Sequence, residues 1–258
     1  MTGSSQGTDP APERGPAELQ HPRFARAYAR VVGEMNRRGA TEHRRELMAG
    51  LRGSVVEIGA GDGSGFAQYP PAVTHVLAIE PDDYLRSIAA AKAASAPVPV
   101  TVRAGAAEHI PAADASVDAV VSSLVLCSVS EQAPVLAEIR RVLRPGGTLA
   151  FYEHVRSGNR LIAAVEDLLA PAWQRFAGGC HPNRDTVAAI GEAGFASVGS
   201  RRFNFAVGPL APAWTHVLGT AVSPGQPAGA DLAQAWKLPA QAWKSRRRHW
   251  GERRRRDA

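Results

Sequence analysis

The sequence predicts an α/β fold built on a doubly wound, mostly parallel sheet, and two observations predict it. Over residues 51–155, apolar segments of strand length alternate with segments of helical periodicity. The first of these strands, residues 54–58, runs into a segment with glycine at every second position: Gly59, Gly61, Gly63 and Gly65. Such alternation is typical of a parallel sheet with helices on both faces, and glycine allows the sharp turn after the first strand.

The N-terminal part contains a polar segment followed by two predicted helices. Residues 1–20 are rich in Ser, Gly, Pro and charge, so we expect them to be disordered and find no apolar segment typical of a signal peptide. Residues 21–50 have apolar side chains at helical spacing, among them Phe24, Tyr28, Val31 and Val32. No run of 18 apolar residues occurs, so no membrane-spanning segment is expected.

The glycine spacing after the first strand excludes two kinds of nucleotide site. A dinucleotide fingerprint requires G-x-G-x-x-G, but Ser64 and Phe66 occupy the positions where its last glycine would fall. No Lys-Ser or Lys-Thr pair follows, which excludes a phosphate-binding P-loop. The loop is therefore expected to bind a nucleotide-like ligand by another pattern.

Polar or small residues follow each of the next three predicted strands. Strand 76–79 ends at Glu80, which lies 21 residues beyond Gly59, the spacing that brings a carboxylate to the hydroxyls of a ribose. Strand 98–102 leads into residues 105–108, and strand 117–121 leads into Ser122 and Ser123. Since the carboxyl ends of parallel strands share one sheet edge, these segments are expected to form one site.

The remaining elements complete a domain over residues 21–222, with residues 51–155 as its core. A helix is predicted over 131–143, a Pro-Gly-Gly turn at 145–147 and a fifth strand over 148–152. A helix over 161–176 is expected to be interrupted at Pro171, and a helix over 185–193 to end at Gly194. Segments 195–205 and 216–222 supply the last two strands.

These motifs resemble those of the class I S-adenosylmethionine-dependent methyltransferases. The resemblance rests on the Glu-x-Gly-x-Gly-x-Gly loop at 57–63, the acid after the second strand and Val-Leu-Arg-Pro-Gly-Gly at 142–147. It implies a seven-stranded, Rossmann-like methyltransferase sheet with an antiparallel edge strand. Segments 105–108, 110–111 and 116–118 are similar to the ubiquinone/menaquinone biosynthesis methyltransferases.

A narrower resemblance is to the thiol methyltransferases called methyltransferase-like protein seven. It is carried by Tyr-Pro-Pro at 69–71, Leu-Val-Leu-Cys-Ser-Val at 124–129, Phe-Tyr-Glu-His-Val at 151–155 and Gly-Cys at 179–180 with Arg-Asp at 184–185. The eukaryotic members have an N-terminal membrane anchor, which this sequence does not match.

The resemblance implies S-adenosylmethionine as cofactor and a set of residues that bind it. Glu57 is expected to organise the loop and reach the methionyl amino group, Glu80 to accept hydrogen bonds from the ribose, and Ser123 to lie near the methionyl part. The full implied set is Glu57, Gly59, Gly61, Gly63, Glu80, Pro81, Ala106, Ala107 and Ser123. Ala106 stands where many relatives have Asp, so only backbone contacts to the adenine are expected there.

His154 is the candidate general base, since it follows Glu153 at the carboxyl end of the fifth strand, where the transferred methyl group should point. A packed histidine is the alternative, because methyl transfer to a thiolate needs little beyond alignment. Cys180 and His181 are adjacent, and adjacent residues rarely bind one metal ion. No metal site is predicted.

Residues 223–258 are predicted to be a linker and a basic tail rich in Trp and Arg. Residues 244–258 hold eight Lys or Arg and two Asp or Glu, so the net charge of +6 lies there and the rest is neutral. Trp236, Trp243 and Trp250 recur every seven residues. The tail could be a solvated end, bind nucleic acid or an anionic membrane, or dock on a protein surface.

The predicted function is methyl transfer from S-adenosylmethionine to a small molecule, with a thiol favoured by the narrower resemblance. The alternatives are O- or C-methylation of a quinone-like metabolite, a nicotinamide-dependent oxidoreductase and a non-catalytic cofactor-binding scaffold. Methylation of nucleic-acid amino groups is disfavoured, because the Asn/Asp-Pro-Pro-aromatic motif is replaced by Ser-Ser-Leu-Val at 122–125. Two cysteines in 258 residues suit a reducing cytoplasm, which is the expected location.

Overall fold

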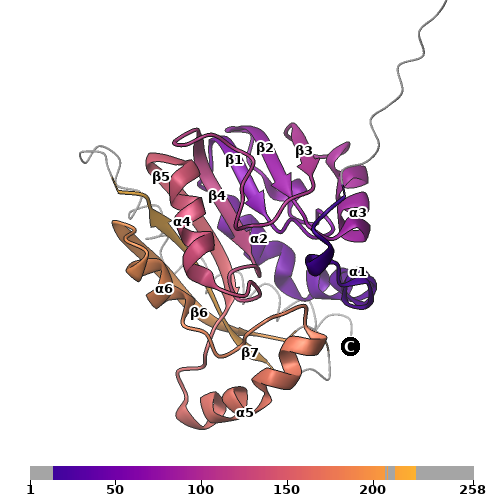
Figure 1. Cartoon of the computed structure of the whole chain (residues 1–258), viewed down its shortest axis with the longest axis vertical. Coiled ribbons are helices and arrows are strands. Elements are labelled where there is room, and N and C mark those ends of the chain that lie inside the picture. The colour runs from indigo at the N-terminus through magenta and orange to yellow at the C-terminus, as the bar shows by residue number, and fades with distance from the viewer. Residues whose placement is uncertain (1–13, 207, 209–212, 225–258) are drawn as a thin grey trace, which may run out of the picture. The chain divides into compact units, whose positions relative to one another are not determined.

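The computed structural model describes residues 14–206, 208 and 213–224, which contain a seven-stranded sheet of order β3-β2-β1-β4-β5-β7-β6 (Figure 1). The strands are β1 (Gly53–Ile58), β2 (Val73–Ile79), β3 (Val100–Arg103), β4 (Val117–Ser123), β5 (Leu143–His154), β6 (Ser197–Phe205) and β7 (Trp214–Val222). Strands β1 to β5 are parallel, whereas β7 is antiparallel to both β5 and β6. The predicted fold class is confirmed, with the antiparallel strand lying one place in from the edge.

Six helices and three short turns accompany these strands within the described residues, and those of residues 17–48 precede the first strand. The helices are α1 (Pro22–Met35), α2 (Thr41–Met48), α3 (Asp83–Ala93), α4 (Gln132–Val142), α5 (Arg160–Phe176) and α6 (Thr186–Glu192), and the turns are η1 (Ala17–Leu19), η2 (Asn36–Ala40) and η3 (Phe66–Gln68). Helices α1 and α2 match the two helices expected over residues 21–50. The chain bends between them at Gly39, whose φ of 123° most other residues avoid.

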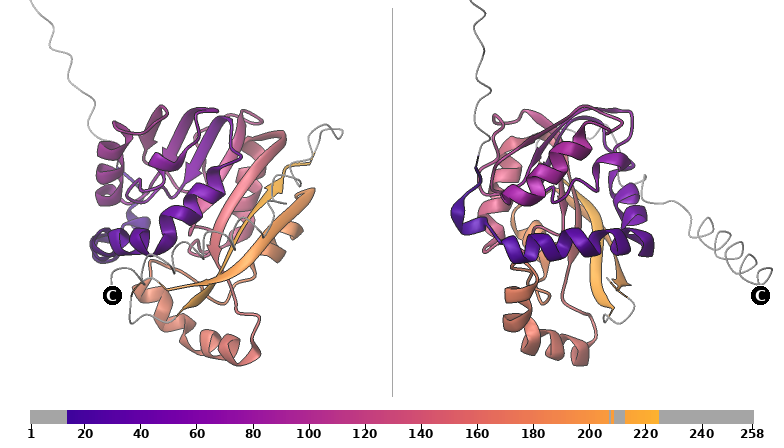
Figure 2. Two further views of the ribbon diagram at one scale, coloured as in Figure 1. Left: turned by 180° about the vertical axis from the view of Figure 1, so that it is seen from behind. Right: turned by 90° about the vertical axis from the view of Figure 1, so that its right-hand side faces the viewer.

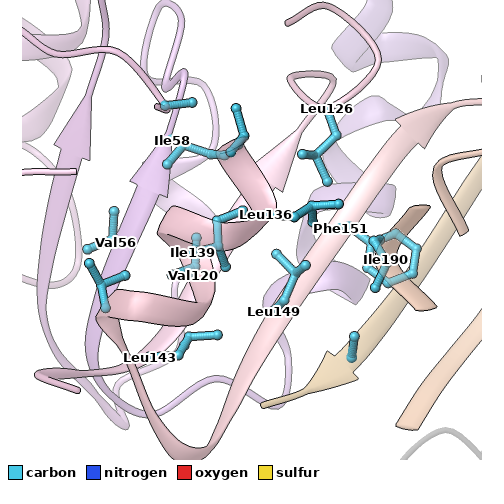
Figure 3. Packing of buried hydrophobic residues seen from close by; sticks show 14 of the residues in the cluster. Val56, Ile58, Val120, Leu126, Leu136, Ile139, Leu143, Leu149, Phe151 and Ile190 are labelled. Carbon is cyan, nitrogen blue, oxygen red and sulfur yellow. The ribbon is translucent and has the colours of Figure 1, made fainter. Parts of the chain in front are cut away.

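One large apolar core lies between the sheet and the helices α4 and α6. Leu136 and Ile139 of α4 pack against strand residues such as Val120 and Leu149, and all four are fully or almost fully buried (Figure 3). Burying each such side chain stabilises the fold by roughly 1.5–3 kcal/mol. The apolar stripe of α4 therefore fixes the helix on the sheet and holds the carboxyl ends of β1 and β4 in place.

Strand β5 is longer at both ends than the predicted strand 148–152. The Pro-Gly-Gly segment pairs with the end of the domain, where Gly146 N–H donates to the Ser223 carbonyl (3.1 Å) and Ser223 N–H donates to the Gly147 carbonyl (2.8 Å). This long-range pairing turns an expected loop into part of the strand. At its other end β5 extends to His154 through its pairing with β7.

Helix α5 runs continuously through Pro171, so the predicted interruption is wrong. Proline removes one backbone hydrogen bond, but contacts on both sides of it hold the helix together. Ala163 and Ala170 are buried on the inner face. The outer face is solvent-exposed, with Leu161 and Leu168 at 80% and 79% exposure, and Figure 2 shows α5 beyond the end of the sheet, away from β1–β3.

Residues 14–20, part of the segment expected to be disordered, lie against the loop after β2. Gly15 N–H donates to Asp83 Oδ1 (2.9 Å), and the Gln20 side-chain amide donates to the Pro81 carbonyl (2.7 Å). Residues 1–13 and the basic tail, with its three regularly spaced tryptophans, lie outside the described residues. Of the helices in the described part, none has the length and apolar character needed to cross a membrane.

Candidate functional site

The carboxyl ends of three parallel strands meet at one edge of the sheet. Ile58, the last residue of β1, is in register with Ile79 of β2 and with Ser122 of β4. The glycine loop, the loop that begins at Glu80 and the loop that begins at Leu124 therefore leave the sheet side by side. This is the arrangement expected for a ligand site in an open α/β sheet.

The glycine loop follows a path that side chains would obstruct. Gly59, Gly61 and Gly63 have φ of 57°, 58° and 74°, in the left-handed region that favours glycine. A Cβ atom on Gly59 would lie 2.5 Å from the nearest Val125 methyl carbon, and one on Gly63 would lie 2.7 Å from the Phe66 ring. The loop is thus packed tightly on both sides.

Glu80 joins the glycine loop to the loop after β2. Its Oε2 accepts a hydrogen bond from Gly61 N–H (2.7 Å) and its Oε1 accepts one from Asp82 N–H (2.9 Å). The side chain is buried, and burial raises its pKa to about 7 against the opposing effect of these two hydrogen bonds. Each carboxylate oxygen keeps a free lone pair, so Glu80 can still accept hydrogen bonds from two ligand hydroxyls.

Glu57 lies beneath the same loop on the opposite face of β1 from the large core. Its Oε2 accepts a hydrogen bond from the Tyr69 hydroxyl (2.8 Å), and burial raises its pKa to about 7. Asp62 is also buried and binds Lys92 Nζ (2.5 Å). Sequence reasoning missed Tyr69 as a partner of Glu57, although the Tyr-Pro-Pro segment had been noted.

Helix α1 covers the glycine loop through Tyr28. A Cβ atom on Gly61 would lie 3.5 Å from the Tyr28 ring, so the ring packs against the loop backbone. Burial raises the pKa of the Tyr28 hydroxyl, which stays neutral and able to donate a hydrogen bond. The tyrosine had been recognised only as part of an apolar helix face.

The other predicted cofactor residues reach the same edge through the strand register. Glu80 N–H donates to the Arg103 carbonyl (3.0 Å), which brings the segment after β3, with Ala106 and Ala107, beside the Glu80 loop. Ser123 ends β4, and its buried hydroxyl has no hydrogen-bond partner among the described residues. The edge thus presents acids that can bind hydroxyls and an unpaired serine, which fits a nucleoside-containing ligand.

Glu153 supports the loop after β4 and does not share a site with His154. Its Oε1 accepts a hydrogen bond from Ser122 Oγ (2.6 Å), and its Oε2 accepts one from Cys127 N–H (3.0 Å). Consecutive strand residues point to opposite faces of the sheet, so Glu153 and His154 point apart. Both residues do lie at the carboxyl end of the fifth strand as predicted, but Glu153 faces the opposite side of the sheet from His154.

His154 belongs to an aromatic cluster at the carboxyl end of β5. Its ring stacks on that of His216, with centroids 4.9 Å apart and planes 7° apart, because the two residues are directly paired between β5 and β7. Trp214 lies 5.5 Å and Trp173 of α5 lies 6.4 Å from it, centroid to centroid. Cys180 Sγ lies 3.4 Å from His154 Nδ1.

This group, here called the aromatic–histidine cluster, consists of His43, Tyr152, His154, Trp173, Phe203, Phe205, Trp214 and His216. Burial lowers the pKa of His43 to about 4 and that of His216 to about 3, so both are neutral near pH 7. Five buried polar atoms of the cluster have no hydrogen-bond partner within the described residues: His43 Nδ1, Tyr152 Oη, His154 Nε2, Trp173 Nε1 and Trp214 Nε1.

A single loop connects the two halves of the site. Val125 packs against Gly59 of the glycine loop, and Leu124 N–H donates to the Tyr152 carbonyl (2.7 Å). Two residues further on, Cys127 lies beside Cys180, which contacts His154. The acid-rich edge and the aromatic–histidine cluster are therefore neighbours.

Sequence reasoning found His154 but missed its neighbours from other elements. Cys180 had been weighed as a partner of His181, whereas its sulfur contacts His154 and Cys127. Only the antiparallel pairing of β5 with β7 brings Trp214 and His216 next to His154, and no local sequence motif predicts these contacts. Within the described part of the chain, no three His, Cys, Asp or Glu side chains are grouped as metal ligands.

Comparisons with known proteins agree with this geometry. The family described as "Methyltransferase domain" matches residues 56–151. Human thiol S-methyltransferase TMT1B is 31% identical over 204 residues, which cover 74% of this chain and 83% of the relative. Human thiol S-methyltransferase TMT1A is 38% identical over 151 residues, covering 56% of this chain and 61% of the relative.

Similarity to solved structures bears on the fold alone. A putative methyltransferase from Bacillus halodurans superposes with a TM-score of 0.58 at 18% identity, covering 70% of this chain and 99% of the other. The sheet of the present chain is thus that of a methyltransferase fold, while its aromatic–histidine cluster must be interpreted from its own residues.

Proposed function

Because this chain belongs to the class I S-adenosylmethionine-dependent methyltransferases, in the family that includes the thiol S-methyltransferases TMT1A and TMT1B, we propose that it methylates the sulfur of a small thiol. S-adenosylmethionine supplies an electrophilic methyl group on a sulfonium, and S-adenosylhomocysteine is released. The alternatives of a nicotinamide-dependent oxidoreductase and a non-catalytic scaffold find no support in these relatives.

The observation that supports the thiol proposal is that two chemically different groups of residues, the acids around Glu80 and the aromatic–histidine cluster, are neighbours at one edge of the sheet. The half around Glu80 can accept hydrogen bonds from a nucleoside, whereas the aromatic–histidine cluster consists of aromatic rings, among them the neutral imidazoles of His43 and His216. A thiol is a soft, weakly hydrated group that makes favourable contacts with aromatic rings. A carboxylate or phosphate acceptor would find no Lys or Arg among the residues of the cluster to offset the cost of burying its charge.

For the cofactor, we assign each predicted residue a role that its position supports. Glu80 and the adjacent Pro81 would hold the ribose, and the backbone at Ala106 and Ala107 would meet the adenine. The glycine loop at 59–63, organised by Glu57, and the unpaired Ser123 hydroxyl would face the methionyl part. Tyr28 would close over the loop as part of α1.

For the acceptor, we infer that His154 takes the thiol proton at Nε2. This atom is buried and has no partner in the described structure, while Nδ1 faces Cys180 Sγ. A free thiol has a pKa of about 8.5, so a neighbouring base increases the reactive thiolate near pH 7. Alignment of the thiolate with the methyl group supplies most of the remaining acceleration.

We further propose that the enzyme works in the cytoplasm. Both cysteines are free although their sulfur atoms lie 3.8 Å apart, as suits a reducing compartment. The basic segment 244–258 supports an additional contact with an anionic surface, either nucleic acid or a lipid bilayer. This contact would be separate from methyl transfer.

The test is an acceptor panel with methyl-labelled S-adenosylmethionine. The purified protein is incubated with alkyl thiols, aryl thiols, phenols and quinols of similar size, and products are identified by mass spectrometry. We expect S-methyl products from thiols and little label in the oxygen analogues. Preferential labelling of phenols or quinols would replace the thiol proposal with O- or C-methylation, and a Glu80→Ala protein controls for uncatalysed transfer.

A further inference from the structure

The two cysteines of this chain come together from distant parts of the sequence. Cys127 lies in the loop after β4, Cys180 lies between α5 and α6, and their sulfur atoms are 3.8 Å apart. The chain has no other cysteine. A disulfide requires sulfur atoms about 2.05 Å apart, so the two sulfur atoms must approach each other further before a bond can form.

The backbone holds this approach in place. His181 N–H donates to the Cys127 carbonyl (2.7 Å), which ties the residue after Cys180 directly to the other cysteine. Gly179 packs so closely on this loop that an added Cβ would lie 2.7 Å from the Ser128 carbonyl oxygen. The two segments therefore lie side by side independently of the sulfur atoms.

The two thiols differ in the way that an attacking and a resolving cysteine differ. Cys180 is 9% exposed, and its sulfur lies 3.4 Å from His154 Nδ1. The hydrogen bond between Cys180 and Cys127, together with the nearby imidazole of His154, lowers the pKa of the Cys180 thiol, which favours the thiolate. Cys127 is 1% exposed, and its hydrogen bond to Cys180 together with burial raises the pKa of its own thiol.

We propose that Cys127 and Cys180 form a reversible disulfide by exchange with a small organic disulfide, and that this bond switches methyl transfer off. The Cys180 thiolate attacks the organic disulfide R–S–S–R, which forms a mixed disulfide and releases one thiolate RS⁻. The Cys127 thiol then attacks the Cys180 sulfur, giving the protein disulfide and a second RS⁻, with its proton passing to a released thiolate. The protein loses two electrons to the organic disulfide, which becomes two thiols.

Closing the bond would disturb the acceptor side of the site. Cys180 must leave its position beside His154 Nδ1, and Cys127 must pull on the loop that Glu153 holds through Cys127 N–H. That same loop packs against the glycine loop through Val125. A misplacement of about 1 Å at a reacting centre can lower a rate by on the order of 10²-fold.

The first test measures the bond itself and needs neither cofactor nor acceptor. The full-length protein is treated with bis(2-hydroxyethyl) disulfide and analysed by intact mass and by non-reducing peptide mapping. We expect a loss of about 2 Da, the two thiol hydrogens, with a peptide linking Cys127 to Cys180, reversed by a reducing dithiol. A protein that keeps both thiols free under this treatment would overturn the proposal.

Two variants assign the order of attack. In Cys127→Ser, Cys180 should hold one 2-mercaptoethanol unit as a stable mixed disulfide, because no resolving thiol remains. In Cys180→Ser, the more deeply buried Cys127 should react far more slowly. The opposite pattern, with the adduct on Cys127, would contradict the assigned roles.

The second test compares methylation by the oxidised and reduced protein and rests on the proposed function. We expect a fall on the order of 10²-fold on oxidation, restored by the dithiol, and no comparable oxidant-dependent fall in Cys180→Ser, which lacks the attacking thiol, relative to its own reduced state. Equal activity of the cross-linked and reduced protein would refute the switch. If no thiol is methylated, weaker binding of S-adenosylhomocysteine to the oxidised than to the reduced protein would support the switch, and equal binding to both forms would refute it.

Discussion

Burial sets the ionisation of the acids at the cofactor edge, and this has a measurable consequence. Glu57 and Glu80 have pKa values raised to about 7, far above that of an exposed glutamate. A carboxylate accepts hydrogen bonds from ribose hydroxyls better when it is ionised. Below pH 7 the ligand must therefore displace a proton from Glu80 to gain its best contacts.

The affinity for S-adenosylhomocysteine should accordingly rise with pH between about 6 and 8. Glu80→Ala should weaken binding by about tenfold or more, since each charged hydrogen bond contributes roughly 1.5–3 kcal/mol, and should flatten the part of the pH dependence due to Glu80. Calorimetry at several pH values measures both effects, with Glu192→Ala on the exposed end of α6 as control. Unchanged affinity in a folded Glu80→Ala protein would remove Glu80 from the ribose site.

Gly59 and Gly61 offer a matched pair, because both have positive φ but only one is crowded. Gly61→Ala should cost about 1–2 kcal/mol from backbone strain alone. Gly59→Ala adds a collision with Val125, so we expect a further 1–3 kcal/mol, approximately. Urea unfolding of both variants gives the comparison, and equal losses would show that the loop relaxes around the added methyl group.

His154→Ala tests the role inferred for the imidazole. If Nε2 accepts the thiol proton, methylation at neutral pH should fall by roughly 10²-fold or more and recover as the pH approaches the thiol pKa of about 8.5. His75→Ala on β2, away from the cluster, serves as control. Rates equal to those of the unmodified protein at every pH would assign His154 to packing.

At the scale of elements, α5 lies between the aromatic–histidine cluster and the protein surface. Its inner face brings Trp173 to within 5.2 Å of Trp214, centroid to centroid, while its outer face exposes Leu168. The Asn159 side chain caps the helix by accepting hydrogen bonds from the N–H groups of Leu161 (2.9 Å) and Ile162 (3.4 Å). The helix therefore has one face that forms the site and one that does not.

Trp173→Ala should raise the KM for an aromatic or alkyl thiol, because an aromatic contact contributes about 0.5–1.5 kcal/mol beyond burial. This corresponds to an increase of about twofold to tenfold, with kcat less affected. Leu168→Ala is the matched control on the outer face and should leave KM and stability nearly unchanged. Similar changes of KM in both variants would mean that α5 affects acceptor binding only by stabilising the fold and that Trp173 does not contact the acceptor.

At the scale of the molecule, the described domain is complete without the basic tail. Strand β7 ends at Val222, and Ser223 closes it by hydrogen bonds with Gly146 and Gly147. The excess positive charge lies beyond this point, in residues 244–258. Methyl transfer and binding to anionic surfaces should therefore be separable.

Deleting residues 226–258 should leave cofactor affinity, thiol methylation and melting temperature nearly unchanged. Binding to DNA or to phosphatidylserine vesicles should fall sharply, and in the full-length protein it should weaken as salt is added. Thermal shift and vesicle sedimentation measure the two effects. If the tryptophans stabilise the domain instead, truncation should lower the melting temperature by several degrees.

The sequence by itself determined the fold class, the glycine loop, the acid after β2 and the membership of the methyltransferases. These features are local: a strand, a turn with alternating glycines and a carboxylate at fixed spacing can be recognised within about 30 residues. The start of β5 was less predictable, because its Pro-Gly-Gly segment pairs with the distant Ser223. The continuity of α5 through Pro171 was also less predictable, because the buried inner face of the helix outweighs the tendency of proline to interrupt it.

Only the tertiary structure decided which residues form the aromatic–histidine cluster and the contact between the two cysteines. Trp214 and His216 of β7 lie 60 and 62 residues beyond His154 and reach it because β7 pairs with β5, and Cys180 reaches Cys127 across 53 residues. The hydrophobic periodicity of the sequence does not predict such contacts, because each depends on the register of the strands and on the path of loops that are distant in sequence. The register likewise turns Glu153 away from His154, because neighbouring strand residues must face opposite sides of the sheet.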